Sequence, residues 1–137
     1  MKPVLTDTRP LVAIINPRDA GHAACGAYAA GLTAPMLTTW PVVTEAAWML
    51  RRVPKDVRTL FRMISLRDLQ VAPLPPDSAD WLESFFETYE DQEPQLADAS
   101  LVYLANALGL DTVFTTDRRD FTIYRKDDGA YLKIVPE

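Results

Sequence analysis

Four carboxylates in this 137-residue chain occupy positions from which they could act together on one ion. Asp7 ends the apolar run 4–6, and Asp117 closely follows another short apolar run. Glu45 and Asp98 lie near the starts of apolar helical segments. Each of them alone has an ordinary explanation, because Asp is a common cap or turn residue and a helical Glu is usually solvated. The case for chemistry depends on whether the fold brings them together.

A parallel sheet would do so, because its strand C-termini and the helix N-termini that follow them share one edge. Carboxylates gathered at that edge repel one another and raise each other's pKa values unless a cation lies among them. Oxygen ligands with no His or Cys nearby suit Mg²⁺ or Mn²⁺. The chemistry expected from such a site is hydrolysis of a phosphate ester by a metal-activated water, with one or two metal ions.

The hydrophobic pattern predicts elements that alternate between strand and helix. The expected strands are 4–7, 36–39, 69–72, 112–115 and 131–135, and the expected helices are 19–31, 41–53, 55–67, 77–89 and 97–108. The apolar run 11–15 is too short for an independent helix; Pro10 suits its first turn and Asn16-Pro17 ends it. Alternation of this kind predicts an α/β fold whose mainly parallel sheet is covered on both faces.

Local signals set the expected ends of several helices. Asp19 is expected to cap the first long helix, and Asp77 with Asp80 forms a capping-box-like pair. Gly109 is expected to end the most apolar helix in a left-handed conformation. Helix 55–67 should bury a stripe that includes Phe61.

Composition restricts the function classes. One cysteine and one histidine exclude a disulfide framework and a structural zinc site, and we interpret the pair His22 and Cys25 as structural. No apolar run reaches membrane-spanning length and no signal-peptide pattern is present, so we expect a cytoplasmic protein of one domain, residues 1–137. The net charge of −5 makes the chain a poor non-specific binder of nucleic acid unless its basic residues gather on one face.

Two groups of basic residues could approach a phosphate chain. Lys55, Arg58 and Arg62 share a helical face with Arg51, Arg52 and Arg67 nearby, but a solvated face explains them adequately. Arg118 and Arg119 are better candidates, because they follow Asp117 and should lie at the rim of the site. Trp40 could stack on a base, although a Trp beside a Pro is more often a packing residue.

The order of the acidic motifs resembles that of a known family. The motifs are Leu5-Thr6-Asp7-Thr8, Thr44-Glu45-Ala46, Ala97-Asp98-Ala99-Ser100-Leu101 and Thr115-Thr116-Asp117-Arg118-Arg119-Asp120-Phe121. In this order they resemble PIN domains, and among these the VapC-type ribonuclease toxins, over essentially the whole chain.

The resemblance implies a three-layer α/β/α sandwich and a Mg²⁺- or Mn²⁺-dependent endoribonuclease. It implies that Asp7, Glu45, Asp98 and Asp117 hold the metal or orient its water, with Asp120 in support. It also implies an antitoxin partner whose C-terminal segment covers the acidic pocket, and frequent homodimers. Arg9 departs from the family pattern, which has a small polar residue or glycine there in many members. That arginine could contact the scissile phosphate or weaken metal binding.

The sequence leaves three other functions to consider besides a toxin ribonuclease. A haloacid-dehalogenase-like phosphatase also begins with a strand ending in Asp, but it needs a second Asp where this chain has Arg9. A PIN-like module that binds RNA or protein without catalysis is disfavoured because all four acids are present. A nuclease that processes RNA without acting as a toxin is equally compatible with the residues.

Overall fold

The computed structural model describes residues 1–137, and its centre is a single five-stranded sheet. The strands are β1 (Val4–Thr6), β2 (Met36–Thr39), β3 (Leu69–Ala72), β4 (Thr112–Phe114) and β5 (Lys133–Val135). The α-helices are α1 (Thr8–Ile15), α2 (His22–Gly31), α3 (Trp40–Met49), α4 (Pro54–Ser65), α5 (Ser78–Thr88), α6 (Leu96–Leu108) and α7 (Arg118–Phe121), and a 3₁₀ turn covers Glu90–Gln92. All neighbouring strands run parallel, so the predicted α/β/α sandwich is confirmed.

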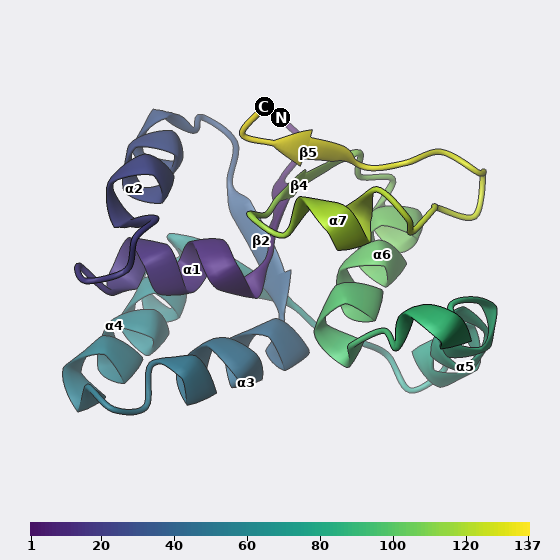
Figure 1. Cartoon of the computed structure of the whole chain (residues 1–137), viewed down its shortest axis with the longest axis horizontal. Coiled ribbons are helices and arrows are strands. Elements are labelled where there is room, and N and C mark those ends of the chain that lie inside the picture. Colours follow the sequence, from purple (N-terminus) through teal and green to yellow (C-terminus); the bar gives the residue numbers. More distant parts are fainter.

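The strand order β3-β2-β1-β4-β5 places the first strand in the middle of the sheet. Helices α1, α2 and α4 lie on one side of the sheet, and α5 and α6 lie on the other (Figure 1). The chain therefore moves outward from β1 to β3 and then returns to β4 on the other side of β1. Open α/β sheets bind ligands at such a reversal, beyond the carboxyl ends of the strands. In this chain that point lies between β1 and β4.

Burial of the central strands on both faces explains their uninterrupted apolar sequences. Leu5 of β1 and Val113 of β4 are fully buried. The predicted apolar face of α6 packs into the same core through Leu101, Val102 and Ala105. The core therefore fixes the two strand ends and the helix that carry three of the four candidate acids.

Several predicted element ends differ from the structure. The run 11–15 belongs to a longer helix, α1, which begins at Thr8 because Asp7 caps it. The strands β1, β4 and β5 are shorter than expected, and Tyr131 forms only an isolated antiparallel bridge with Arg125. Asp7 and Thr115, which were predicted to end their strands, lie just beyond them, and their side chains form a hydrogen bond there.

Two of the predicted helix caps were wrong. Asp19 accepts a hydrogen bond from the Gly21 amide at 2.8 Å, and α2 begins only at His22 without a side-chain cap. Asp77 makes no capping hydrogen bond to α5, so the capping box with Asp80 does not form. The left-handed cap was correct, since Gly109 has φ 64°.

Two aromatic residues expected to pack are exposed. Phe61 is 46% exposed and Trp40 is 51% exposed, because each lies on the outward side of its helix. The pair interpreted as structural does pack: Cys25 is buried, and His22 Nδ1 hydrogen bonds with the Ala13 carbonyl oxygen at 2.8 Å. No helix combines the length and apolar character needed to cross a bilayer.

Candidate active site

The carboxyl edge of the sheet contains a polar cavity of about 170 Å³, here called the acidic cavity. Its lining residues are Asp7, Thr8, Arg9, Glu45, Gln92, Glu93, Gln95, Asp98, Asp117, Asp120 and Tyr124. All four candidate acids and Asp120 are therefore brought to one place by segments far apart in the sequence.

Asp7 is the most constrained of these carboxylates. It ends β1 and caps α1, where Oδ1 accepts a hydrogen bond from the Thr8 amide at 2.8 Å. Oδ2 accepts a hydrogen bond from the Thr115 hydroxyl at 2.8 Å. The pKa of Asp7 is raised to about 6, mainly by burial and to a smaller extent by the nearby charges of Glu45 and Asp117, even though both hydrogen bonds lower it.

Thr115 connects Asp7 to the next acid. Its side-chain oxygen also accepts a hydrogen bond from the Asp117 amide at 3.0 Å, so one buried hydroxyl fixes the backbone that carries Asp117. The carboxyl ends of β1 and β4 are thereby held in one arrangement.

Asp98 enters the acidic cavity from the first turn of α6 and is almost completely buried. Burial raises its pKa to about 8, with further contributions from the charges of Asp7, Asp120 and Asp117. Burial and Asp117 also raise the pKa of Asp120. The phenol of Tyr124 is kept protonated by burial and by Asp98 and Asp120, which raise its pKa. The cavity therefore holds carboxylates that repel one another.

Glu45 reaches the acidic cavity from α3, and a buried hydroxyl pair fixes this helix against α6. Thr39 caps α3 by accepting a hydrogen bond from the Val42 amide at 3.5 Å. Its hydroxyl also lies 2.7 Å from the Ser100 hydroxyl, which donates to the Ala97 carbonyl oxygen. This contact sets the position of the helix that carries Glu45 relative to the helix that carries Asp98.

The three candidate arginines occupy different surroundings. Arg9 lines the acidic cavity. Arg119 lies in an adjoining hollow that shares Asp120 with that cavity. Arg118 does not line it, because its guanidinium donates to the Pro136 carbonyl oxygen at 3.0 Å. Of the two arginines after Asp117, only Arg119 has the expected position beside the site.

Two solved structures have a fold similar to that of this chain. VapC20 of Mycobacterium tuberculosis, a sarcin-ricin loop cleaving toxin, superposes with a TM-score of 0.74 at 20% identity, covering 85% of this chain and 93% of VapC20. VapBC2 of Rickettsia felis, bound to a DNA fragment from their promoter, matches with a TM-score of 0.61 at 12% identity, covering 96% of each chain. The fold is that of a PIN domain. No protein-family model matches the sequence, and neither does any curated protein sequence.

Within this PIN fold, the donor atoms suit a hard divalent cation. The acidic cavity offers carboxylate oxygens and no His or Cys. Thr8 also lines this cavity, and its hydroxyl is the one buried side-chain polar atom without a hydrogen-bond partner. In this conformation no three acidic side chains converge tightly enough to form a complete ligand set. Because like charges favour separation, a bound cation would have to draw these side chains inward.

Some PIN-fold cavity residues were missed by the sequence analysis. Thr8 lines the acidic cavity, and Thr115 supports it through its hydrogen bond to Asp7. Both lie inside the acidic motifs, so their position beside an acid was the available signal. Glu93 lines the acidic cavity from a left-handed conformation with φ 49°. Tyr124 comes from a segment with no clear periodicity, and nothing local distinguished it.

Proposed function

We propose that this chain is a metal-dependent endoribonuclease. The observation that supports the proposal best is a cavity at the reversal point of a PIN-like fold that is lined by six acidic residues, five of them from the four acidic motifs. A purely structural role is a poor explanation for the two buried acids, Asp7 and Asp98, because burying carboxylates beside other carboxylates costs folding free energy unless a cation compensates.

Asp7, Glu45, Asp98 and Asp117 would hold Mg²⁺ or Mn²⁺. Bound there, the ion would polarise the scissile phosphate and make a water molecule a better nucleophile. The protein itself contributes by positioning the carboxylates that would bind the metal ion. Thr115 fixes the Asp7 carboxylate, and Asp120 lies between Asp98 and Asp117. Water attack on phosphorus with departure of the 3′-oxygen leaves a 5′-phosphate and a 3′-hydroxyl.

We further propose that the chain is the toxin of a toxin–antitoxin pair and forms homodimers. The likeness to a sarcin-ricin loop cleaving toxin and to a VapBC assembly supports the pairing. A segment of an antitoxin that covers the acidic cavity would block both the metal site and the substrate. Purification of the chain with the product of a neighbouring small reading frame, followed by mass measurement of the complex, tests this role separately from catalysis.

The nuclease proposal is tested by cleavage of RNA with Mg²⁺, Mn²⁺ or EDTA, comparing the wild type with Asp7→Asn and Asp98→Asn. We expect cleavage with either metal, none with EDTA, and a loss of at least about 100-fold in each variant, as for removal of a key electrostatic group. Asp68→Asn is the matched control, because Asp68 is exposed and lies outside the acidic cavity. Metal-independent cleavage would exclude the mechanism. RNA binding with no cleavage under any condition would favour a non-catalytic module.

A further inference from the structure

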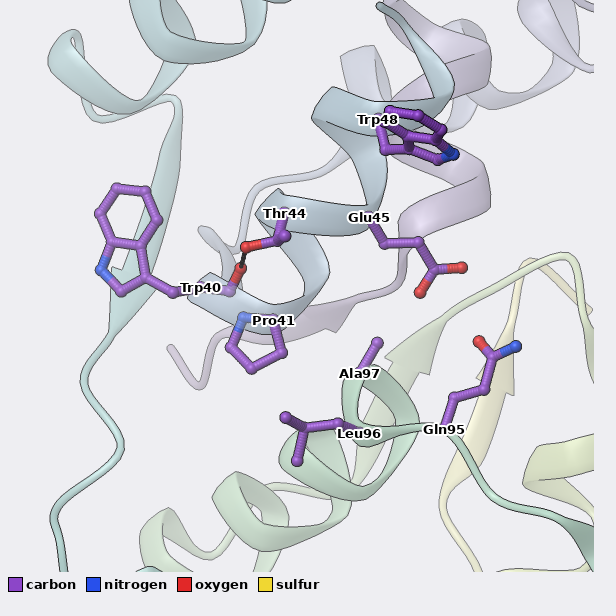
Figure 2. A pocket seen from close by; sticks show the side chains of 8 residues that line it. All are labelled: Trp40, Pro41, Thr44, Glu45, Trp48, Gln95, Leu96 and Ala97. Atoms are coloured by element: carbon purple, nitrogen blue, oxygen red, sulfur yellow. Dashed lines mark hydrogen bonds between the residues drawn. The ribbon is translucent and has the colours of Figure 1, made fainter.

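A second hollow lies directly beside the acidic cavity, between α3, along most of its length, and the start of α6 (Figure 2). It has a volume of about 780 Å³ and is here called the aromatic groove. Its lining residues are Trp40, Pro41, Thr44, Glu45, Trp48, Gln95, Leu96 and Ala97. The groove is mainly apolar, and its lining contains one carboxylate and no lysine or arginine.

The apolar side chains of the aromatic groove are unusually accessible to solvent. Trp40 is 51% exposed, Trp48 is 64% exposed and Leu96 is 47% exposed. Trp40, Thr44 and Trp48 are four residues apart on α3, so they share one face of the helix. Exposed apolar surface that is gathered in a hollow marks a binding site more often than isolated exposed residues do.

Trp48 is held in position by a neighbouring arginine. The guanidinium carbon of Arg51 lies 3.8 Å from the centre of the Trp48 ring, and Arg51 also donates to the Trp48 carbonyl oxygen at 2.9 Å. This contact restrains the indole without filling the groove. A restrained indole loses less conformational entropy when a planar ligand stacks on it.

The aromatic groove and the acidic cavity share two lining residues. Glu45 and Gln95 belong to both. Figure 2 shows these two side chains on the same side of the groove, Glu45 from α3 and Gln95 from the residue before α6. A linear polymer that has one unit bound in the acidic cavity would therefore place its next unit in the aromatic groove.

We propose that the aromatic groove binds unpaired nucleobases of single-stranded RNA next to the scissile phosphate, an inference that rests on the proposed function. Phosphate attraction is weak in a protein of net charge −5 whose cavity is acidic, so affinity must come largely from another source. Stacking of bases on aromatic side chains supplies it, and tolerates any sequence. The Gln95 amide offers both a donor and an acceptor to a base edge. Bases in a duplex are already stacked and paired, so only an unpaired strand fits.

The test measures binding rather than cleavage, in the Asp98→Asn background, by tryptophan fluorescence and by anisotropy of a labelled RNA. The probes are a 12-nucleotide single-stranded RNA of mixed sequence, the same strand in a duplex, and a version with abasic residues at its centre. We expect the single strand to bind and to quench fluorescence, and both other probes to bind more weakly. Trp48→Leu should weaken binding of the single strand about 5- to 100-fold, whereas Trp48→Phe should keep most of the affinity.

Leu108→Ala is the matched control, because Leu108 is 53% exposed at the far end of α6 and outside the groove. Equal affinity of Trp48→Leu and the parent protein would overturn the proposal. The proposal would also be overturned if Trp48→Leu changed only the oligomeric mass of the protein, because the groove would then be an interface between protein chains. If the wild-type protein cleaves RNA and Trp48→Leu does not change RNA binding, the role of the groove is rejected and the nuclease proposal stands. If RNA binding depends on Trp48 but no RNA is cleaved, only the nuclease proposal is rejected.

Discussion

The Thr115 hydroxyl donates to Asp7 Oδ2 at 2.8 Å, across 108 residues of sequence. The same oxygen accepts a hydrogen bond from the Asp117 amide at 3.0 Å. Because the other oxygen of Asp7 accepts from the Thr8 amide, the carboxylate has little freedom to rotate. One neutral side chain thus sets the geometry of two acids in the proposed metal site.

Thr115→Val tests this role, since valine has the same shape without the donor. The hydrogen bond lowers the pKa of Asp7, so its loss should raise that pKa further, by about one unit for a bond to a charged group. We expect the acid limb of the cleavage rate to move to higher pH, with the activity reduced about threefold at pH 6.5 and approaching a tenfold loss below pH 5. The measurement is a pH–rate profile at a fixed metal concentration below saturation, where protonation of Asp7 still competes with metal binding. Thr116→Val, at the exposed neighbouring position, should leave the profile unchanged.

The metal-free protein should lose stability as pH rises from about 4 to about 8. Folding raises the pKa of Asp7 to about 6 and that of Asp98 to about 8. The folded state therefore binds protons more tightly than the unfolded state in this range, and its stability declines as these protons dissociate. Urea unfolding at pH 5, 6, 7 and 8 with EDTA measures the decline.

Asp98→Asn isolates the contribution of one carboxyl to that slope. The variant removes a charge that is costly to bury, so at pH 8 it should be more stable than the wild type by more than about 1 kcal/mol, the equivalent of one pKa unit. At pH 5 the two proteins should be close in stability. A wild-type curve that is flat, or one that rises between pH 5 and 8, would contradict the assigned burial of Asp98.

A divalent cation should stabilise the folded chain whether or not RNA is present. Mg²⁺ or Mn²⁺ at about 100 times its dissociation constant adds about 2.7 kcal/mol by mass action. The gain should be larger at pH 8 than at pH 5.5, because protons compete for the same oxygens. Thermal unfolding with a metal titration measures this effect. Asp7→Asn should remove most of it, and Asp68→Asn should not.

Ser100→Ala should lower both stability and metal affinity. It leaves the buried Thr39 hydroxyl without its partner, which costs about 1–3 kcal/mol. It also releases the contact between the helices that carry Glu45 and Asp98. Urea unfolding and metal titration measure the two effects. Ser84→Ala, at an exposed position on α5, is the control, and equal behaviour of the two variants would show that the hydroxyl pair has no structural role.

The sequence was sufficient to predict that the four acids lie at one edge of the sheet, because each of them lies beside a strand end or a helix start. In a parallel sheet those positions share one edge, so the convergence of Asp7 and Asp117 follows from local pattern and topology together. The same reasoning could not predict that Thr115 bonds to Asp7, because nothing local distinguishes buried Thr115 from exposed Thr116.

Side-chain direction accounts for the other differences. Arg118 and Arg119 are adjacent in sequence, but successive residues of a helix point in different directions, and only Arg119 lies beside the acidic cavity. Trp40 is the first residue of α3 and projects beyond the sheet edge, so the expectation that it packs was wrong. The aromatic groove could not be predicted, because one of its walls comes from α3 and the other from α6.

The central position of β1 has a consequence for the timing of activity during synthesis. The first strand leaves the ribosome early, yet its neighbour β4 and the hydroxyl that fixes Asp7 are made more than a hundred residues later. We expect a nascent chain stalled at residue 111 to bind no metal and to cut no RNA, and a released chain that includes residues 1–137 to do both. If the proposed function is correct, the nuclease would thus stay inactive during synthesis until β4, Thr115 and Asp117 have been made.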